Sequence, residues 1–204
     1  MTNLILVSAA QTSWAAQGRM AGDTDLPLDE TGNGEAVTDG IELAEAAPSA
    51  VYSGPEEATR QTGAIIAGAV SQKLKTVKDL RELDLGHWEG LSEGDFQERF
   101  GKVHRQWKSD PLSVSPPEGE SVAEAEARLA KGIRKIVQQH DGETVVAVLG
   151  RFASAIVRCR LSDQGYGPFW EFVNSARARH AFELDDASIP EETRSSLPEA
   201  PEAS

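Results

Sequence analysis

The sequence contains few of the residues that crosslink small secreted domains or bind metals through sulfur. Among 204 residues there is one cysteine, Cys159, so a disulfide within the chain and a zinc site made of several thiolates are both excluded. No hydrophobic run approaches the roughly 20 residues that a bilayer-spanning helix needs. The first residues lack the basic flank and long apolar core of a signal peptide. These absences predict a cytoplasmic protein that does not bind membranes.

Positive charge is also scarce in this chain. Lysine and arginine total 20 against 33 acidic residues, which gives a formal net charge of −13 at pH 7. The basic residues are scattered, and such a field repels nucleic acids and other polyanions. We therefore expect no nucleic-acid partner. Because no group of His, Cys and Asp residues has the spacing of metal ligands, we expect no metal and no cofactor.

Short apolar runs alternate with helical patterns along most of the chain. LILV (4–7), SAVYS (49–53) and VVAVL (145–149) are typical of buried strands, and RARHAFEL (177–184) alternates like a late strand. Strands that alternate with helices predict an α/β fold, a three-layer α/β/α sandwich with a mainly parallel central sheet. In such a fold the strand ends near Ser8, Ser53 and Leu149 lie close together at one edge of the sheet.

Several helices are predicted from periodicity and capping patterns. Ser121 and Glu124 form a capping-box pattern before a helix with a long apolar face. In an earlier helix, closed by Pro48, the apolar residues that recur at helical spacing are Ala36, Val37, Ile41 and Ala44. Residues 77–85 are expected to be extended, and residues 92–108 are expected to form a polar helix.

The composition changes near the C-terminus. From Ser188 onward the chain consists largely of Pro, Glu, Ser and Ala. Such a segment buries too little apolar area to fold by itself. The sequence therefore predicts a folded domain over residues 1–187 and a disordered, acidic, Pro-rich tail over residues 188–204.

Four segments stand in an order that is typical of one family. They are LILVSAAQTSW (4–14), GRMAGDTDLPLDETG (18–32), VYSGPEEATRQT (51–62) and LRELDLGHWEGL (80–91). The first resembles the Arg-His-Gly strand of the histidine phosphatase superfamily, the phosphoglycerate mutase-like proteins, and the second resembles the loop that follows it. The third resembles the family's Tyr-Ser-Ser-Pro-Leu-x-Arg-Ala-x-Gln-Thr segment, and the fourth its Leu-x-Glu loop ending in Gly-x-Trp-Glu-Gly. The resemblance covers roughly residues 3–185 and implies a phosphoglycerate mutase-like fold.

The resemblance also implies a phosphohistidine mechanism, for which this chain lacks the basic groups. In the family an imidazole attacks phosphorus, a second imidazole and two guanidinium groups hold the phosphoryl oxygens, and a carboxylic acid protonates the leaving oxygen. The nucleophilic histidine position is Ala9, and the second histidine position is Gly150. The two arginine positions are Ser8 and Ala58, while Glu82 keeps the type of the acid. These residues predict a catalytically inactive member of the family.

Nearby residues could have rebuilt part of the site. Arg151 could supply one positive charge at the strand end, although an exposed or ion-paired arginine at a helix start is the simpler interpretation. His87 and Ser8 are the alternative candidates for a nucleophile. The candidates for the remnant of the pocket are Gln11, Thr12, Trp14, Arg19, Glu82, His87 and Arg151.

Three functions are compatible with these residues. The first is an inactive protein with a binding or regulatory role toward a partner protein or a small ligand that is not a phosphate. The second is an enzyme, either a hydrolase with altered chemistry that uses Glu82, or a phosphatase or mutase that works through a rebuilt site. The third is a structural or assembly protein, for which the family resemblance implies a possible homodimer.

Overall fold

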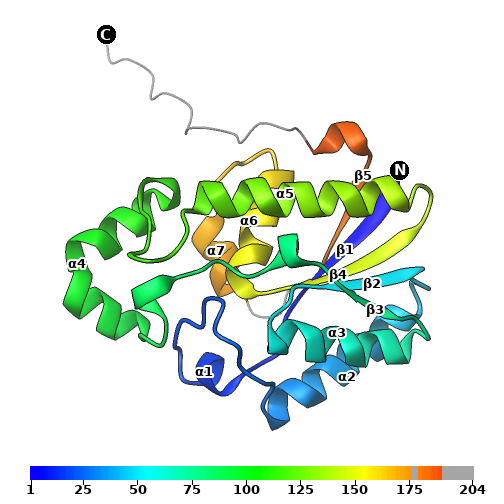
Figure 1. Ribbon diagram of the computed structural model, residues 1–204, viewed down its shortest axis with the longest axis horizontal. Helices are drawn as coiled ribbons and strands as arrows, with labels where there is room; N and C mark the ends of the chain where they lie inside the picture. Colours follow the sequence, from blue (N-terminus) through cyan, green and yellow to red (C-terminus); the bar gives the residue numbers. More distant parts are fainter. Residues whose placement is uncertain (176–178, 190–204) are drawn as a thin grey trace.

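The computed structural model describes residues 1–175 and 179–189 as a five-stranded sheet with helices on both faces (Figure 1). The strands are β1 (Thr2–Ser8), β2 (Ala50–Ser53), β3 (Leu74–Thr76), β4 (Thr144–Leu149) and β5 (Arg179–Leu184). Their order across the sheet is β3-β2-β4-β1-β5. All neighbours are parallel except β1 and β5, which are antiparallel. The predicted α/β class and mainly parallel sheet are confirmed.

Seven α-helices and four 3₁₀ helices complete the part of the chain that the structure describes. The α-helices are α1 (Ser13–Ala16), α2 (Glu30–Ala44), α3 (Glu57–Ala69), α4 (Glu93–Ser109), α5 (Val122–Gln139), α6 (Arg151–Leu161) and α7 (Phe169–Asn174). The 3₁₀ helices are η1 (Lys78–Leu80), η2 (Gly86–Trp88), η3 (Pro111–Ser113) and η4 (Asp186–Ser188). None of the helices in these ranges combines the length and the apolar character that crossing a membrane requires.

The two faces of the sheet bury alternate residues of each strand. Leu4 and Leu6 of β1 pack with residues of α5 and α6, whereas Ile5 and Val7 pack with residues of α2 and α3. This alternation follows from the period of two along a strand. Figure 1 shows the resulting layers, with α5 on one side of the strands and α2 and α3 on the other. The three-layer arrangement therefore follows from the buried, mainly apolar runs of the central strands β1, β2 and β4.

Helix α5 follows its predicted pattern. Ser121 and Glu124 form the capping box, and each side chain accepts a hydrogen bond from a backbone amide of the other residue. The expected apolar face is buried, and its residues are Val122, Leu129, Ile133, Ile136 and Val137. A wide apolar stripe against the sheet stabilises a helix far more than intrinsic propensity does. Local periodicity was sufficient to predict this element.

The buried face of α2 differs from the prediction. The helix forms, but Val37 is 50% exposed and Ile41 is 66% exposed, while Leu43 is buried. Gly40 faces α3, where an added Cβ would lie 2.8 Å from the Cβ of Ala69. Close approach between the two helices therefore selects the face with the small residue, not the face with the larger apolar residues.

The segment predicted as extended over 77–85 is also different. Strand β3 ends at Thr76, and η1 and an irregular segment follow. The guanidinium of Arg128, on α5, donates hydrogen bonds to the carbonyl oxygens of Asp79, Arg81 and Glu82. These carbonyls thus find their partner in a side chain instead of a neighbouring strand.

The other predicted boundaries are adjusted at their ends. Helix α4 covers the predicted polar helix, but the backbone at Phe100 leaves the helical region (φ −130°, ψ 35°). Ser188 and Ile189 belong to the folded domain, because Asp185 and Ser188 form a capping box and Ile189 is 2% exposed. The remaining residues of the predicted tail, 190–204, lie outside the described residues, and their disorder stays a prediction.

Candidate functional site

The ends of three strands meet at one edge of the sheet, as the parallel topology requires. Ser8 at the end of β1 pairs with Leu149 at the end of β4, and Ser53 of β2 pairs with Val148. The backbone amide of Ala9 donates to the carbonyl of Leu149 at 2.8 Å. The predicted convergence of these strand ends is therefore present, and it places Ala9 and Gly150 beside each other.

An open pocket of about 310 Å³ lies over this edge. Its lining comprises Ser8, Ala9, Ala10, Gln11, Ala15, Glu35, Arg151, Phe172, Val173, Asn174 and Ser175. The hydroxyl of Ser8 reaches only the hydroxyl of Ser154, at 3.4 Å. Among the described residues no histidine lines the pocket. The lining therefore offers no nucleophile paired with a base.

Glu82 lies beneath this edge and is buried, with 5% of its surface exposed. Its carboxylate accepts hydrogen bonds from the backbone amides of Phe152 at 2.8 Å and Ala153 at 2.6 Å, in the first turn of α6. The amide of Leu83 donates a third, at 2.7 Å. The Glu82 carboxylate thus takes the hydrogen bonds of amides at the N-terminus of α6, which could otherwise bind an anion. Burial raises the pKa of Glu82 to about 7, although the three amides act in the opposite direction.

Gly150 has no room for a side chain in this arrangement. An added Cβ would lie 2.6 Å from Cδ of Glu82 and closer still to its Oε2 atom. The backbone of Gly150 has φ −65° and ψ 171°, a conformation that any residue adopts. The position is therefore restricted to glycine by the Glu82 carboxylate and not by the backbone.

A second buried carboxylate, Glu56, supports the first. Its Oε1 atom accepts a hydrogen bond from the backbone amide of Glu82 at 2.9 Å, and Oε2 lies 3.3 Å from the hydroxyl of Thr59. Burial raises the pKa of Glu56. The sequence analysis missed this residue, although an acidic residue at the leucine position of the resembled segment was a signal. Glu56 fixes the backbone that carries Glu82.

Arg151 is the cation at the rim of the pocket. Its Nε atom donates to the carbonyl of Val173 at 2.7 Å, and a terminal nitrogen donates to Oδ1 of Asn174 at 3.0 Å. These bonds join the start of α6 to α7. Arg151 is exposed and forms no ion pair with the described residues. It holds the wall formed by residues 172–175 against the strand ends.

Ala58 lies in the first turn of α3 and is not among the described residues that line the pocket. It packs against a small apolar cluster that contains Ala10, Leu28 and Ala36. One helical turn later, the hydroxyl of Thr62 accepts a hydrogen bond from the amide of Ala10 at 3.0 Å. The first turn of α3 therefore contributes apolar packing and a fixed backbone to this site.

Four other predicted residues lie outside the lining of the pocket. Thr12 caps α1 by accepting a hydrogen bond from the amide of Ala15, and Trp14 packs over Gly90. Arg19 is exposed and donates to the carbonyl of Gly90, and His87 is exposed in η2. Of the pocket-remnant candidates, Gln11, Glu82 and Arg151 alone are brought to the strand ends. The other four lie in or next to α1 and η2.

A group of three carboxylates was not foreseen. Asp23, Asp84 and Glu89 bring one oxygen each to within 4.8 Å of one another, and they come from two loops that are far apart in sequence. Burial, followed by the charges of Asp84 and Glu89, raises the pKa of Asp23. The backbone amide of Asp84 donates to Oε1 of Glu120 at 3.3 Å, and Glu120 pairs with Arg81 and Arg128. Oxygen ligands of this kind suit Ca²⁺ or Mg²⁺, but acidic groups also gather at protein surfaces without metal.

The residues 172–175 and Glu35 are the further parts of the pocket that sequence reasoning missed. Glu35 accepts a hydrogen bond from the amide of Gln11 at 3.0 Å. Nothing in the local pattern of these residues distinguishes them from ordinary surface positions. The fold alone brings them to the strand ends.

Comparison with known proteins agrees with this architecture. Residues 4–189 match the histidine phosphatase superfamily (branch 1). The chain is 30% identical over 174 residues to phosphoserine phosphatase 1 of Hydrogenobacter thermophilus, covering 84% of this chain and 82% of that protein. It is 32% identical over 148 residues to the bifunctional protein Rv2228c of Mycobacterium tuberculosis, covering 72% of this chain but 40% of that protein.

Solved structures show the same fold. The structure of Bacillus stearothermophilus YhfR superposes with a TM-score of 0.82 at 23% identity, over 97% of this chain and 98% of that one. Phosphoserine phosphatase from Entamoeba histolytica gives a TM-score of 0.77 at 22% identity, over 90% and 91% of the two chains. This chain therefore belongs to branch 1 of the histidine phosphatase superfamily.

Proposed function

We propose that this protein uses the phosphatase fold for binding and does not transfer phosphoryl groups through a phosphohistidine. One observation carries the proposal. The carboxylate of Glu82 fills the space beside Gly150 and takes the amides of Phe152 and Ala153. At the positions that the sequence resemblance gives to the two histidines, Ala9 and Gly150 offer neither a nucleophile nor a phosphate ligand.

Electrostatics support the same conclusion. A cation 4 Å from a phosphate charge supplies an attraction of about 4 kcal/mol at an effective dielectric of about 20. The described lining of the pocket holds one arginine, Arg151, and one glutamate, Glu35, with Glu82 beneath. A phosphate dianion would therefore meet as much negative as positive charge. A partner protein or a small ligand without a phosphate fits this pocket better.

A second candidate is phosphatase activity through a rebuilt site. The named relatives include phosphoserine phosphatases, which favours an enzyme. Arg151 at the pocket could hold one phosphoryl oxygen. A carboxyl whose pKa lies near 7, as burial produces at Glu82, is suited to general acid or base catalysis. This candidate needs a water molecule or Ser8 as the nucleophile.

Turnover of p-nitrophenyl phosphate by the purified chain separates the two candidates. We expect no turnover above the protein-free rate for the native chain, for Glu82→Gln or for Arg151→Met. Turnover that persists unchanged in both variants would indicate a contaminating phosphatase. Turnover that is lost in either variant would contradict the proposal and establish the rebuilt site.

Restoring the basic groups is the complementary test. A variant with Ser8→Arg, Ala9→His, Ala58→Arg and Gly150→His reinstates the family's residue types, but Glu82 must rotate away to admit the histidine. We expect this variant to gain turnover only if that rotation occurs. Turnover of the native chain that is lost in Glu82→Gln or Arg151→Met would contradict the proposal whatever the restored variant does.

A further inference from the structure

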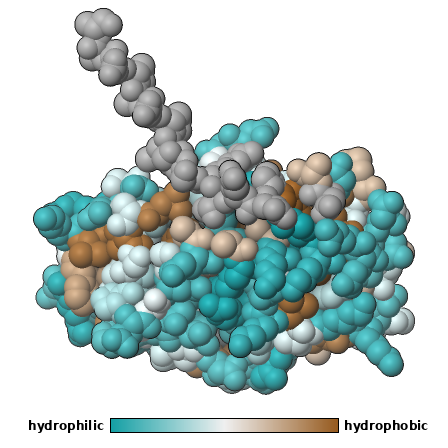
Figure 2. All heavy atoms as spheres, turned by 45° about the horizontal axis from the view of Figure 1, so that its top comes forward, coloured by the Kyte–Doolittle hydropathy of each residue, from teal (hydrophilic) through white to brown (hydrophobic). Residues whose placement is uncertain are grey.

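A second cavity, of about 300 Å³, lies between the end of α4, α5, the end of α6 and the loop before α7. It shares no lining residue with the pocket at the strand ends. Its apolar wall is formed by Pro111, Leu112 and Trp170. Figure 2 shows that exposed hydrophobic side chains gather toward the end of the molecule that holds α4, while the rest of this face is mainly hydrophilic. The cavity is large enough for a small ligand.

A buried ion pair forms part of the cavity. Arg160 donates to Oε1 of Glu126 at 2.8 Å, and the exposed fractions of the two side chains are 4% and 1%. Because the pair is neutral overall, it does not select a ligand with net charge. A buried pair of this kind gains little stability over an apolar pair of similar volume. It does, however, place a carboxylate and a guanidinium in the wall of the cavity.

The hydroxyl of Tyr166 is the most informative group in the cavity. Tyr166 is 9% exposed, and among the described residues no group meets its hydroxyl oxygen with the geometry of an ordinary hydrogen bond, although the Glu126 carboxylate lies nearby. Burial, followed by the nearby charge of Glu126, raises the pKa of Tyr166, so the hydroxyl stays protonated. Buried hydroxyls are nearly always hydrogen-bonded, since leaving one unpaired is unfavourable. A group that enters the cavity and accepts a hydrogen bond would remove this penalty.

The remaining polar groups disfavour an anionic ligand. Lys108 lies over the ring of Trp170, 4.1 Å from its centroid, and pairs with Glu93 at 2.7 Å. Asp110 and Asp163 also line the cavity, so its carboxylates outnumber its cations. Burial raises the pKa of the Cys159 thiol to about 12, which keeps that wall residue unreactive.

We propose that this cavity binds a neutral small molecule with an amide group on a flat apolar ring. The amide carbonyl accepts from the Tyr166 hydroxyl, and the amide N–H donates to the Glu126 carboxylate, which can accept several hydrogen bonds. The ring lies against Trp170, Pro111 and Leu112. The inference rests on this cavity alone and is independent of the proposed function.

Benzamide is the test probe, with benzoate and toluene as analogues of similar size. Binding to the ¹⁵N-labelled full chain is followed by NMR through the indole N–H of Trp170, which donates to the carbonyl of Trp107 at 3.0 Å. Trp170→Phe assigns this signal. We expect a saturable chemical-shift change with benzamide. Toluene, which lacks the amide, and benzoate, which has a charged carboxylate in its place, should each bind about tenfold more weakly.

Variants of the two tyrosines give a matched comparison. Tyr166→Phe should weaken benzamide binding about tenfold and leave toluene unaffected. Tyr52→Phe is the control, because Tyr52 is also buried but its hydroxyl lies 2.8 Å from Nε2 of His140, outside the cavity. This variant should leave benzamide binding unchanged. Leu112→Trp, which fills the cavity from its apolar wall, should abolish the shift even if Tyr166→Phe fails to fold.

Three results would overturn the inference. They are the absence of a saturable shift with benzamide, equal affinity for benzamide and toluene, and unchanged benzamide affinity in Tyr166→Phe. The last would mean that a water molecule alone pairs with the hydroxyl.

Discussion

The buried carboxyl of Glu82 gives the protein a pH-dependent stability that can be calculated. The pKa rises from its ordinary value of 4.5 to about 7 in the folded protein. The folded state therefore holds more protons than the unfolded state between these values. The corresponding stabilisation is complete below about pH 4.5 and is lost as the pH rises through 7. A rise of this size corresponds to roughly 3 kcal/mol in the free energy of unfolding.

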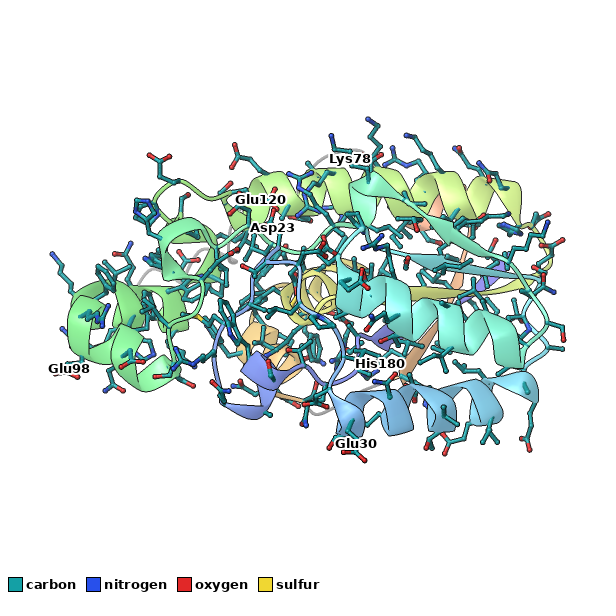
Figure 3. All side chains as sticks on the ribbon, turned by 60° about the horizontal axis from the view of Figure 1, so that its bottom comes forward. Asp23, Glu30, Lys78, Glu98, Glu120 and His180 are labelled. Atoms are coloured by element: carbon teal, nitrogen blue, oxygen red, sulfur yellow. The ribbon has the colours of Figure 1, made fainter. Side chains whose placement is uncertain are left out.

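Urea denaturation of the native chain and of Glu82→Gln, between pH 4.5 and 8.5, measures this contribution. The free energy of unfolding of the variant, minus that of the native chain, should increase by roughly 3 kcal/mol across the range. Titrating groups that do not interact with Glu82 cancel in the difference, whereas Glu56, whose charge acts on Glu82, does not cancel completely. Glu98→Gln, an exposed position on α4 (Figure 3), is the control for the loss of one negative charge.

A flat difference between Glu82→Gln and the native chain would refute the reasoning. It would mean that Glu82 is ionised throughout, because the amides of Leu83, Phe152 and Ala153 compensate fully for burial. The pocket would then carry a permanent negative charge at its base. The exclusion of phosphate would be stronger than proposed.

Three further outcomes follow from the contacts. Gly150→Ala should lower the free energy of unfolding, measured by urea denaturation, by about 1–3 kcal/mol, because the added Cβ overlaps the Glu82 carboxylate. Adding Glu82→Ala should recover part of that loss, and equal losses in the single and double variants would contradict this account. Glu126→Ala should lower the free energy of unfolding by about 3–5 kcal/mol, since the buried guanidinium of Arg160 would lose the Glu126 carboxylate, and a loss under 1 kcal/mol would show that other contacts of Arg160 compensate for that carboxylate. Millimolar phosphate, vanadate or tungstate should not raise the melting temperature, and a rise of several degrees would reveal an anion site that includes Arg151.

The sequence was sufficient for β1, β2, β4 and β5, for α5 and for the family, whereas β3 (Leu74–Thr76) was not predicted. Strand β4 and the buried face of α5 are encoded by local patterns. In each, the spacing of the apolar residues determines which side chains are buried. The convergence of Ser8 and Leu149 also followed from sequence, because parallel strands joined by helices end at a common edge. The family resemblance added the prediction that Ser8, Ala9, Ala58 and Gly150 stand where the family has basic residues.

Tertiary structure decided the face of α2, the contacts of Glu82 and the second cavity. Gly40 determines which side of α2 meets α3, and that contact depends on a helix that follows it in the chain. The carboxylate of Glu82 takes the amides of Phe152 and Ala153, about 70 residues away, which no local pattern of residues encodes. Tyr166 is identified only in the packed chain, where no described residue meets its buried hydroxyl with the geometry of an ordinary hydrogen bond. Burial and hydrogen bonding between distant segments are properties of the packed chain, so they could not be predicted from the residues alone.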